Sequence, residues 1–198
     1  MKTTVTPLLQ GELSKPSRIV LAFLALAMLP ALVLPVWHMR LNAPQYPDGL
    51  DVTIYSHTVG GDLREINGLN HYIGMDPIEP DEFPEFRFIP FFILRLVLFA
   101  GLAALVARIP IAAIGWIDLV LFGSVMMFDF QSWLTRFGTN LAPEAAITLE
   151  PFAPKFIGTT TIAQFSVESY PAAATVMMMI AGVAGPIILF YEWYRRRA

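Results

Sequence analysis

The chain has 198 residues, is 56% hydrophobic and carries a net charge of -3, with a mean hydropathy of +0.58. A soluble domain of this length is less apolar, and the small charge, without a basic patch among aromatic residues, argues against nucleic acid as a partner. The chain contains no cysteine. This excludes disulfides, thiolate zinc sites, iron–sulfur clusters, covalent c-type haem and the two-cysteine type of binuclear copper site.

Long apolar runs indicate membrane spans, because about 20 apolar residues cross ~30 Å of hydrocarbon. We expect an all-α membrane protein with four transmembrane helices, at residues 19–37, 88–107, 111–130 and 172–191. Prolines within the first run should kink that helix or end it early. The lipid bilayer is therefore the first partner that the sequence predicts.

The distribution of basic residues predicts the orientation. In a four-span arrangement the following fall on one side: Lys2, Lys15, Arg18, Arg108, Arg195, Arg196 and Arg197. By the positive-inside rule, residues 1–18 and 192–198 then face the cytoplasm. Residues 38–87 and 131–171, called here the two outer segments, face the periplasmic side of a bacterial inner membrane. We expect them to form a small mixed cap.

The first outer segment contains a predicted strand. In residues 50–57 apolar and polar side chains alternate, which is typical of a half-buried strand and puts His57 on its polar face. Residues 159–162 in the second outer segment are a further strand candidate.

The first outer segment also predicts a short helix over residues 62–75, lying on the membrane face. Asp62 begins an Asp-x-x-Glu capping box, and Gly74 is a natural end residue. His71 and Met75 would then share one helix face, and an imidazole with a thioether suits copper, above all Cu(I). The alternative is that His71 hydrogen-bonds to the nearby backbone and Met75 packs in the core or on lipid.

The other histidines also fall on the predicted outer side. His38 and Met39 offer a second imidazole–thioether pair at the membrane edge, and His57 is a third candidate ligand. No histidine lies within a predicted span, which argues against a b-type haem held by two imidazoles. Copper is thus the one cofactor candidate.

Three charged residues fall in or near the hydrocarbon: Arg95, Asp118 and Asp129. Ionisable groups at that depth pair or line a cavity. A pair of Arg95 with Asp129 is geometrically possible, because arginine can extend its head outward. Asp118 has no evident cationic partner, so it is either a proton or cation site or a hydrogen-bonding residue between helices.

Both outer segments contain sequence blocks that resemble one protein family. The first block runs through Asn42-Ala43-Pro44-Gln45-Tyr46-Pro47 and residues 66–75, and the second includes Asp129-Phe130, Trp133, Asn140 and Ser169-Tyr170-Pro171. They are similar to a family of small bacterial membrane proteins encoded beside nitrous-oxide reductase and its copper-site accessory proteins. The resemblance implies these positions to test: Asn67, Asn70, His71, Tyr72, Gly74 and Met75, then Asp129, Trp133 and Asn140.

The resemblance and the outer histidines and methionines together favour one function. We expect an accessory protein that supports a periplasmic copper enzyme, through nitrous-oxide reductase maturation or electron or copper supply, by way of its outer cap. Enzymatic activity is not expected, since no catalytic motif is present. Two alternatives stay open: a small transporter or channel module that uses Asp118 and Arg95, and a structural subunit of a respiratory membrane complex.

Overall fold

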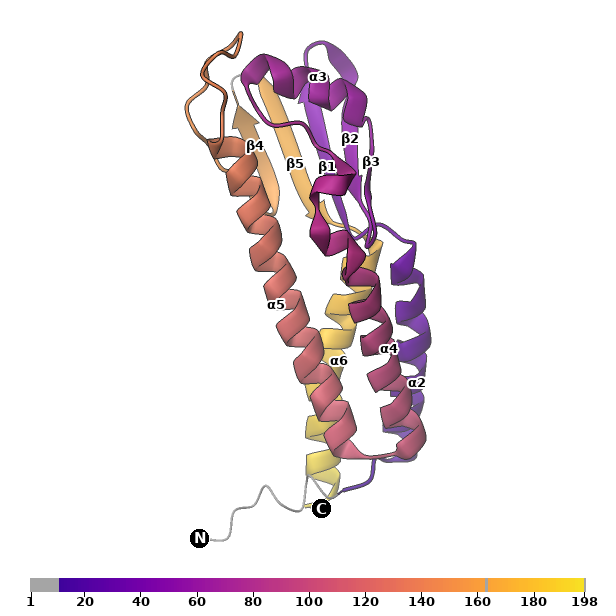
Figure 1. The fold of residues 1–198 in the computed structure, drawn as a ribbon. Coiled ribbons are helices and arrows are strands. Elements are labelled where there is room, and N and C mark those ends of the chain that lie inside the picture. The colour runs from indigo at the N-terminus through magenta and orange to yellow at the C-terminus, as the bar shows by residue number, and fades with distance from the viewer. Residues whose placement is uncertain (1–10, 163, 198) are drawn as a thin grey trace.

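A computed structural model describes residues 11–162 and 164–197 and shows a bundle of long helices beneath a β-sheet (Figure 1). The long helices are α2 (Lys15–Met28, continued by a 3-10 turn over Leu29–Leu32), α4 (Ile89–Val106), α5 (Ile109–Thr139) and α6 (Ala173–Arg195). These four are long and apolar enough to cross a membrane, judged by length and composition. The predicted membrane character is confirmed at that level.

The sheet corrects the expected fold class. Five antiparallel strands lie in the order β3-β2-β1-β5-β4, so the protein is mixed α/β and the all-α prediction was wrong. The strands are β1 (Trp37–Ala43), β2 (Tyr46–Ile54), β3 (Val59–Gly61), β4 (Gly158–Ile162) and β5 (Phe165–Pro171). The two outer segments share this sheet because β1 pairs with β5, a pairing between distant parts of the chain that local sequence patterns do not show.

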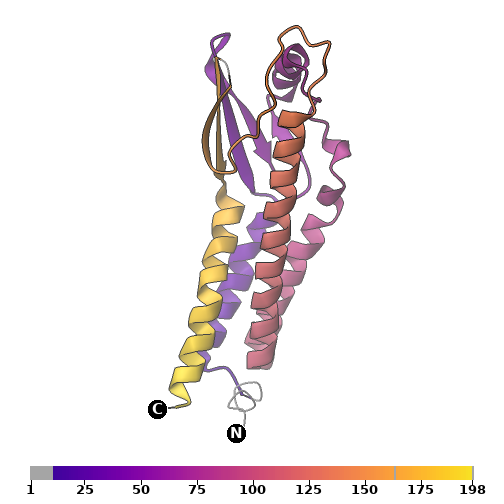
Figure 2. The same ribbon diagram turned by 90° about the vertical axis from the view of Figure 1, so that its left-hand side faces the viewer.

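Two helix ends differ most from the predicted spans. The first span ends at Leu32, well before residue 37, because the prolines interrupt the helical hydrogen bonding, and Trp37 begins β1 instead. Helix α5 continues past residue 130 to Thr139. At 1.5 Å per residue its length is ~46 Å, longer than ~30 Å of hydrocarbon. Its last turns therefore stand beside the sheet, as Figure 2 shows.

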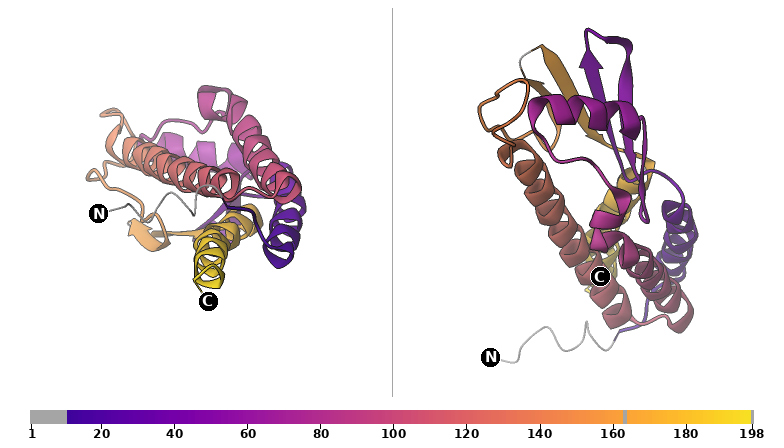
Figure 3. Two further views of the ribbon diagram at one scale, coloured as in Figure 1. Left: turned by 90° about the horizontal axis from the view of Figure 1, so that it is seen from below. Right: turned by 45° about the horizontal axis from the view of Figure 1, so that its top comes forward.

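One face of the sheet is apolar and covered. The predicted alternation in β2 is confirmed: Leu50 and Val52 are buried beneath helix α3 (Leu63–Ile73), where they contact Ile66 and Leu69. Helix α3 was expected on the membrane face, but it packs across the strands instead (Figure 3). Packing against the sheet buries Ile66 and Ile73, which removes their apolar side chains from water.

After α3, residues 74–88 return to α4 through two 3-10 turns, Pro80–Glu82 and Pro84–Arg87. We call residues 37–88 and 140–171 the cap.

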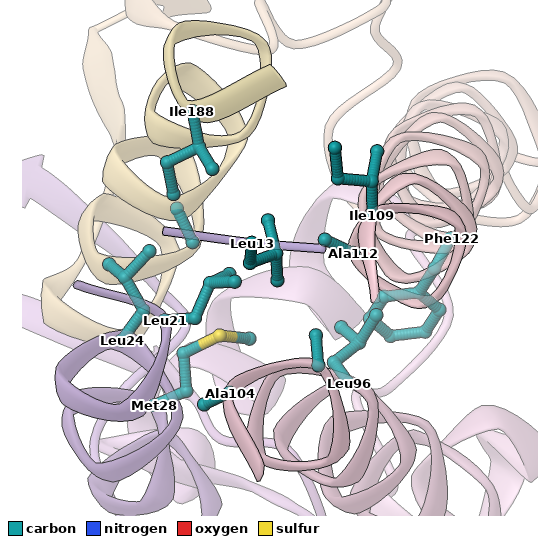
Figure 4. Close-up of a cluster of buried hydrophobic side chains, with 12 residues drawn as sticks. Leu13, Leu21, Leu24, Met28, Leu96, Ala104, Ile109, Ala112, Phe122 and Ile188 are labelled. Atoms are coloured by element: carbon teal, nitrogen blue, oxygen red, sulfur yellow. The ribbon is translucent and has the colours of Figure 1, made fainter. Parts of the chain in front are cut away.

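The helices share a compact apolar core. Its buried side chains come from all four helices and from the segment before α2 (Figure 4). They include Leu13, Leu21, Leu24, Met28, Leu96, Ile109, Phe122 and Ile188. The opposite sides of the helices carry many exposed large apolar residues, as expected for surfaces in contact with lipid.

A buried carboxylate joins two helices at the bundle end away from the cap. Glu192 of α6 is 0% exposed. Its Oε1 accepts hydrogen bonds from the backbone N–H and Oγ of Ser14, at 2.8 and 2.5 Å, and from Ser17 Oγ at 2.6 Å. Arg195 donates to its Oε2 at 3.2 Å. Glu192 therefore caps the N-terminus of α2, where free backbone amides favour a negative charge.

We predict that Glu192→Ala lowers the free energy of unfolding by ~2–4 kcal/mol, because several hydrogen bonds to a buried carboxylate are lost together. Glu192→Gln, which keeps an acceptor oxygen, should cost less. Thermal unfolding of the purified protein in detergent measures both. Glu150→Ala, at an exposed carboxylate, is the matched control. Equal melting temperatures for Glu192→Ala and this control would contradict the assigned role.

Candidate functional site

The block of residues 66–75 holds the cap together through its asparagines. The side chain of Asn67 bonds both backbone groups of Ile78: Oδ1 accepts from its N–H at 2.7 Å, and Nδ2 donates to its carbonyl at 3.2 Å. The buried Asn70 donates to the carbonyl of Asp76 at 3.3 Å. Both asparagines therefore fasten the segment after α3 to the helix.

The end of α3 also contacts the second outer segment. Gly74 ends the helix with a left-handed φ of 77°, and a Cβ there would lie 2.8 Å from the carbonyl oxygen of Ala142, so glycine is required. Its own carbonyl accepts from the N–H of Ala142 at 2.8 Å. Asn140 donates to the carboxylate of Asp76 at 2.8 Å. Gly74 and Asn140 thus join the two halves of the cap.

The structure separates His71 from Met75. The helix ends at Ile73 and the chain reverses at Gly74, so the expectation that both residues share a helix face was wrong. Met75 packs beside Ala43 and Phe165, whereas His71 is exposed. Copper binding by either residue stays a prediction.

His38 and Met39 also point to different places, since successive strand residues face opposite sides of a sheet. His38 lies on the outer face, with Nε2 3.0 Å from Asp51 Oδ1 and Nδ1 3.2 Å from Thr53 Oγ1, whereas Met39 faces the core.

His57 is exposed beyond the end of β2. Within residues 11–162 and 164–197, no three His, Asp or Glu side chains are grouped to hold a metal ion. The structure therefore does not bring the three histidines to one site.

Arg95 pairs with Asp118 and not with Asp129, so the prediction that Asp118 lacks a cationic partner was wrong. Arg95 Nε donates to Asp118 Oδ2 at 2.9 Å, and its Nη2 donates to Oδ1 at 2.6 Å. The two residues are nearly equally far from the turn at Ala107, so the antiparallel helices α4 and α5 place them at the same depth. A two-pronged pair neutralises both charges within the hydrocarbon.

Asp129 has a different neighbour, Glu85, which lies in the segment between α3 and α4. The carboxyl groups of Asp129 and Glu85 lie in contact. Trp133 Nε1 donates to Glu85 Oε1 at 3.4 Å, and Glu85 Oε2 is buried without a hydrogen-bond partner. The sequence around Glu85 does not predict that this residue is buried, because its neighbours Asp129 and Trp133 come from α5.

These polar groups line an apolar cavity, which we call the interface cavity. It has a volume of about 470 Å³ and lies between the covered face of the sheet and the upper parts of α5 and α6. Its walls include Val52 and Ile54 of the sheet, Phe130 and Trp133 of α5, and Met178 of α6. Of the residues singled out from the sequence, the cavity brings together Asp129, Trp133, Met75, Met39 and Asn70.

The sequence was compared with protein-family models and with curated proteins, and neither comparison finds a match. The similarity to the family encoded beside nitrous-oxide reductase therefore remains a prediction.

We predict that Arg95→Leu and Asp118→Leu each reduce the amount of folded protein in the membrane, because each leaves a lone charge in the hydrocarbon, costing ~2.5–3.5 kcal/mol. The double variant should recover most of the loss, since it leaves no charge. Size-exclusion chromatography of detergent extracts measures the folded fraction. Losses that simply add in the double variant would contradict the pairing.

Proposed function

We propose that this protein is a membrane-anchored accessory protein whose cap holds a protein partner outside the membrane. The observation that carries the proposal is a small exposed patch, the α3 tip, made of His71, Tyr72 and Ile147. Tyr72 is 59% exposed and Ile147 is 43% exposed, although both belong to the cap and not to the lipid-facing helices. The rings of His71 and Tyr72 lie 6.5 Å apart.

The backbone beneath the α3 tip is held by hydrogen bonds within the cap. The N–H of Ile147 donates to the carbonyl of Tyr72 at 3.0 Å. Two residues after Tyr72, Gly74 ends helix α3, and its carbonyl accepts a hydrogen bond from Ala142. Exposed tyrosine is enriched at protein interfaces, and a preformed surface binds at a lower cost in conformational entropy. Asn67, Asn70 and Gly74 of the 66–75 block serve the fold, whereas the side chains of His71 and Tyr72 are exposed and available for contact.

The partner in this proposal is a periplasmic copper enzyme, with nitrous-oxide reductase the first candidate. The family resemblance supports that choice. The charge distribution supports the sidedness, because Lys15, Arg18 and Arg195 lie at the bundle end away from the cap, as expected for the cytoplasmic side of a bacterial inner membrane. Since His71 and Met75 do not share a face, holding the enzyme is favoured over a copper site of the cap's own.

The transport alternative has less support. Asp118, the candidate ion or proton site, is already engaged by Arg95 in a two-pronged ion pair. If the Arg95→Leu/Asp118→Leu double variant supports full nitrous-oxide reduction, the transport alternative fails while the docking proposal stands.

We predict that a photo-crosslinking residue at position 72 captures nitrous-oxide reductase in cells respiring nitrous oxide. The same residue at position 161, exposed on edge strand β4, is the control and should capture little of it. Mass spectrometry identifies the adducts. The His71→Ala/Tyr72→Ala variant should lower nitrous-oxide reduction several-fold, whereas Thr159→Ala/Thr161→Ala should not.

Equal capture from positions 72 and 161, or full activity of the His71→Ala/Tyr72→Ala variant, would overturn the docking proposal. Capture of a different enzyme from position 72 alone would retain docking and remove nitrous-oxide reductase as the partner.

A further inference from the structure

We propose that the interface cavity binds a membrane-soluble molecule with a hydroxylated aromatic head and an apolar tail, the chemical class of the quinols. This inference rests on the cavity and not on the proposed partner of the cap. The volume of the cavity, about 470 Å³, falls within the range of ~300–1,000 Å³ that is typical of small-molecule binding sites. The position, opening and lining of the cavity each restrict what fits.

The cavity opens toward lipid between α5 and α6. Met127 of α5 and Met179 of α6 both line it, yet they are 47% and 45% exposed on the outside of helices expected to lie in the membrane. Figure 1 shows α5 leaning away from α6 as it approaches the sheet. A ligand would therefore enter from the bilayer, which selects a molecule that dissolves in hydrocarbon.

The end of the cavity nearest the cap is aromatic. Phe83 and Trp133 have ring centroids 4.6 Å apart, and Phe130 and Phe156 have centroids 5.4 Å apart. All four rings line the cavity. A flat aromatic head can pack among such rings in edge-to-face or offset arrangements, whereas the bulky, charged head group of a phospholipid would lose its hydration there.

The polar groups of the cavity lie at the same end. Glu85 Oε2 is buried without a hydrogen-bond partner, and the carboxyl group of Asp129 lies against that of Glu85. An unused carboxyl oxygen in an apolar cavity is costly unless it accepts a hydrogen bond. A ring hydroxyl can donate that bond, while the tail extends past Met178 toward the opening. Glu85 is thus inferred to hold the head group.

Native mass spectrometry tests the proposal. The full-length protein is placed in phosphatidylcholine nanodiscs that contain a decyl-tailed benzoquinol. We expect one benzoquinol per chain, with occupancy that saturates as its mole fraction rises. Gly123→Leu should reduce occupancy at least tenfold, because Gly123 lines the cavity and there is open space around the position that its Cβ would take. Glu85→Gln should weaken binding without filling the cavity.

Gly101→Leu in α4 is the matched control, since Gly101 has equally open surroundings but does not line the cavity. It should bind as the unaltered protein does, and melting temperatures should confirm that both leucine variants fold. The absence of a saturable benzoquinol adduct, equal binding by Gly123→Leu, or retention of phosphatidylcholine in place of benzoquinol would each overturn the proposal. Loss of capture by the α3 tip would not affect it.

Discussion

The pairing of β1 with β5 is the interaction on which the rest of the structure depends. These strands come from different outer segments, and their register runs from Trp37 opposite Pro171 to Asn42 opposite Ser166. Where they meet the helices, the N–H of Ala172 donates to the carbonyl of Val36 at 3.0 Å. The sheet is thereby attached to the ends of α2 and α6, which places the cap directly on the bundle.

Both candidate sites follow from this attachment. The covered face of the sheet closes the interface cavity from above, and the long helix α5 forms its side by continuing beyond the hydrocarbon to Thr139. Helix α3 crosses the same sheet and is fastened at its end by Gly74 and Asn140. The α3 tip therefore has a fixed position in the cap, whereas the cavity lies between the sheet and the long helices.

Local patterns in the sequence predicted the elements better than their partners. The alternation in residues 50–57 identified much of β2, and apolar run length identified the spans. Residues 37–43 also alternate, but they directly follow the first apolar run, and Trp37 was placed at the end of that predicted span instead of at the start of a strand. Glu85 was missed because its neighbours Asp129 and Trp133 lie on α5, far along the chain. Such contacts depend on tertiary packing, which residue spacing does not encode.

A cross-strand disulfide tests most directly whether the two outer segments form this sheet. The chain contains no cysteine, so a double variant reports only the introduced pair. Arg40 and Glu168 are register partners on the outer face, and Cα atoms of paired antiparallel residues lie within disulfide range. Arg40→Cys/Glu168→Cys should form a disulfide under mild oxidation, which mass spectrometry detects. Arg40→Cys/Val167→Cys is the control and should form none, because Val167 faces the core. Equal disulfide formation in both variants, or none in either, would contradict the shared sheet.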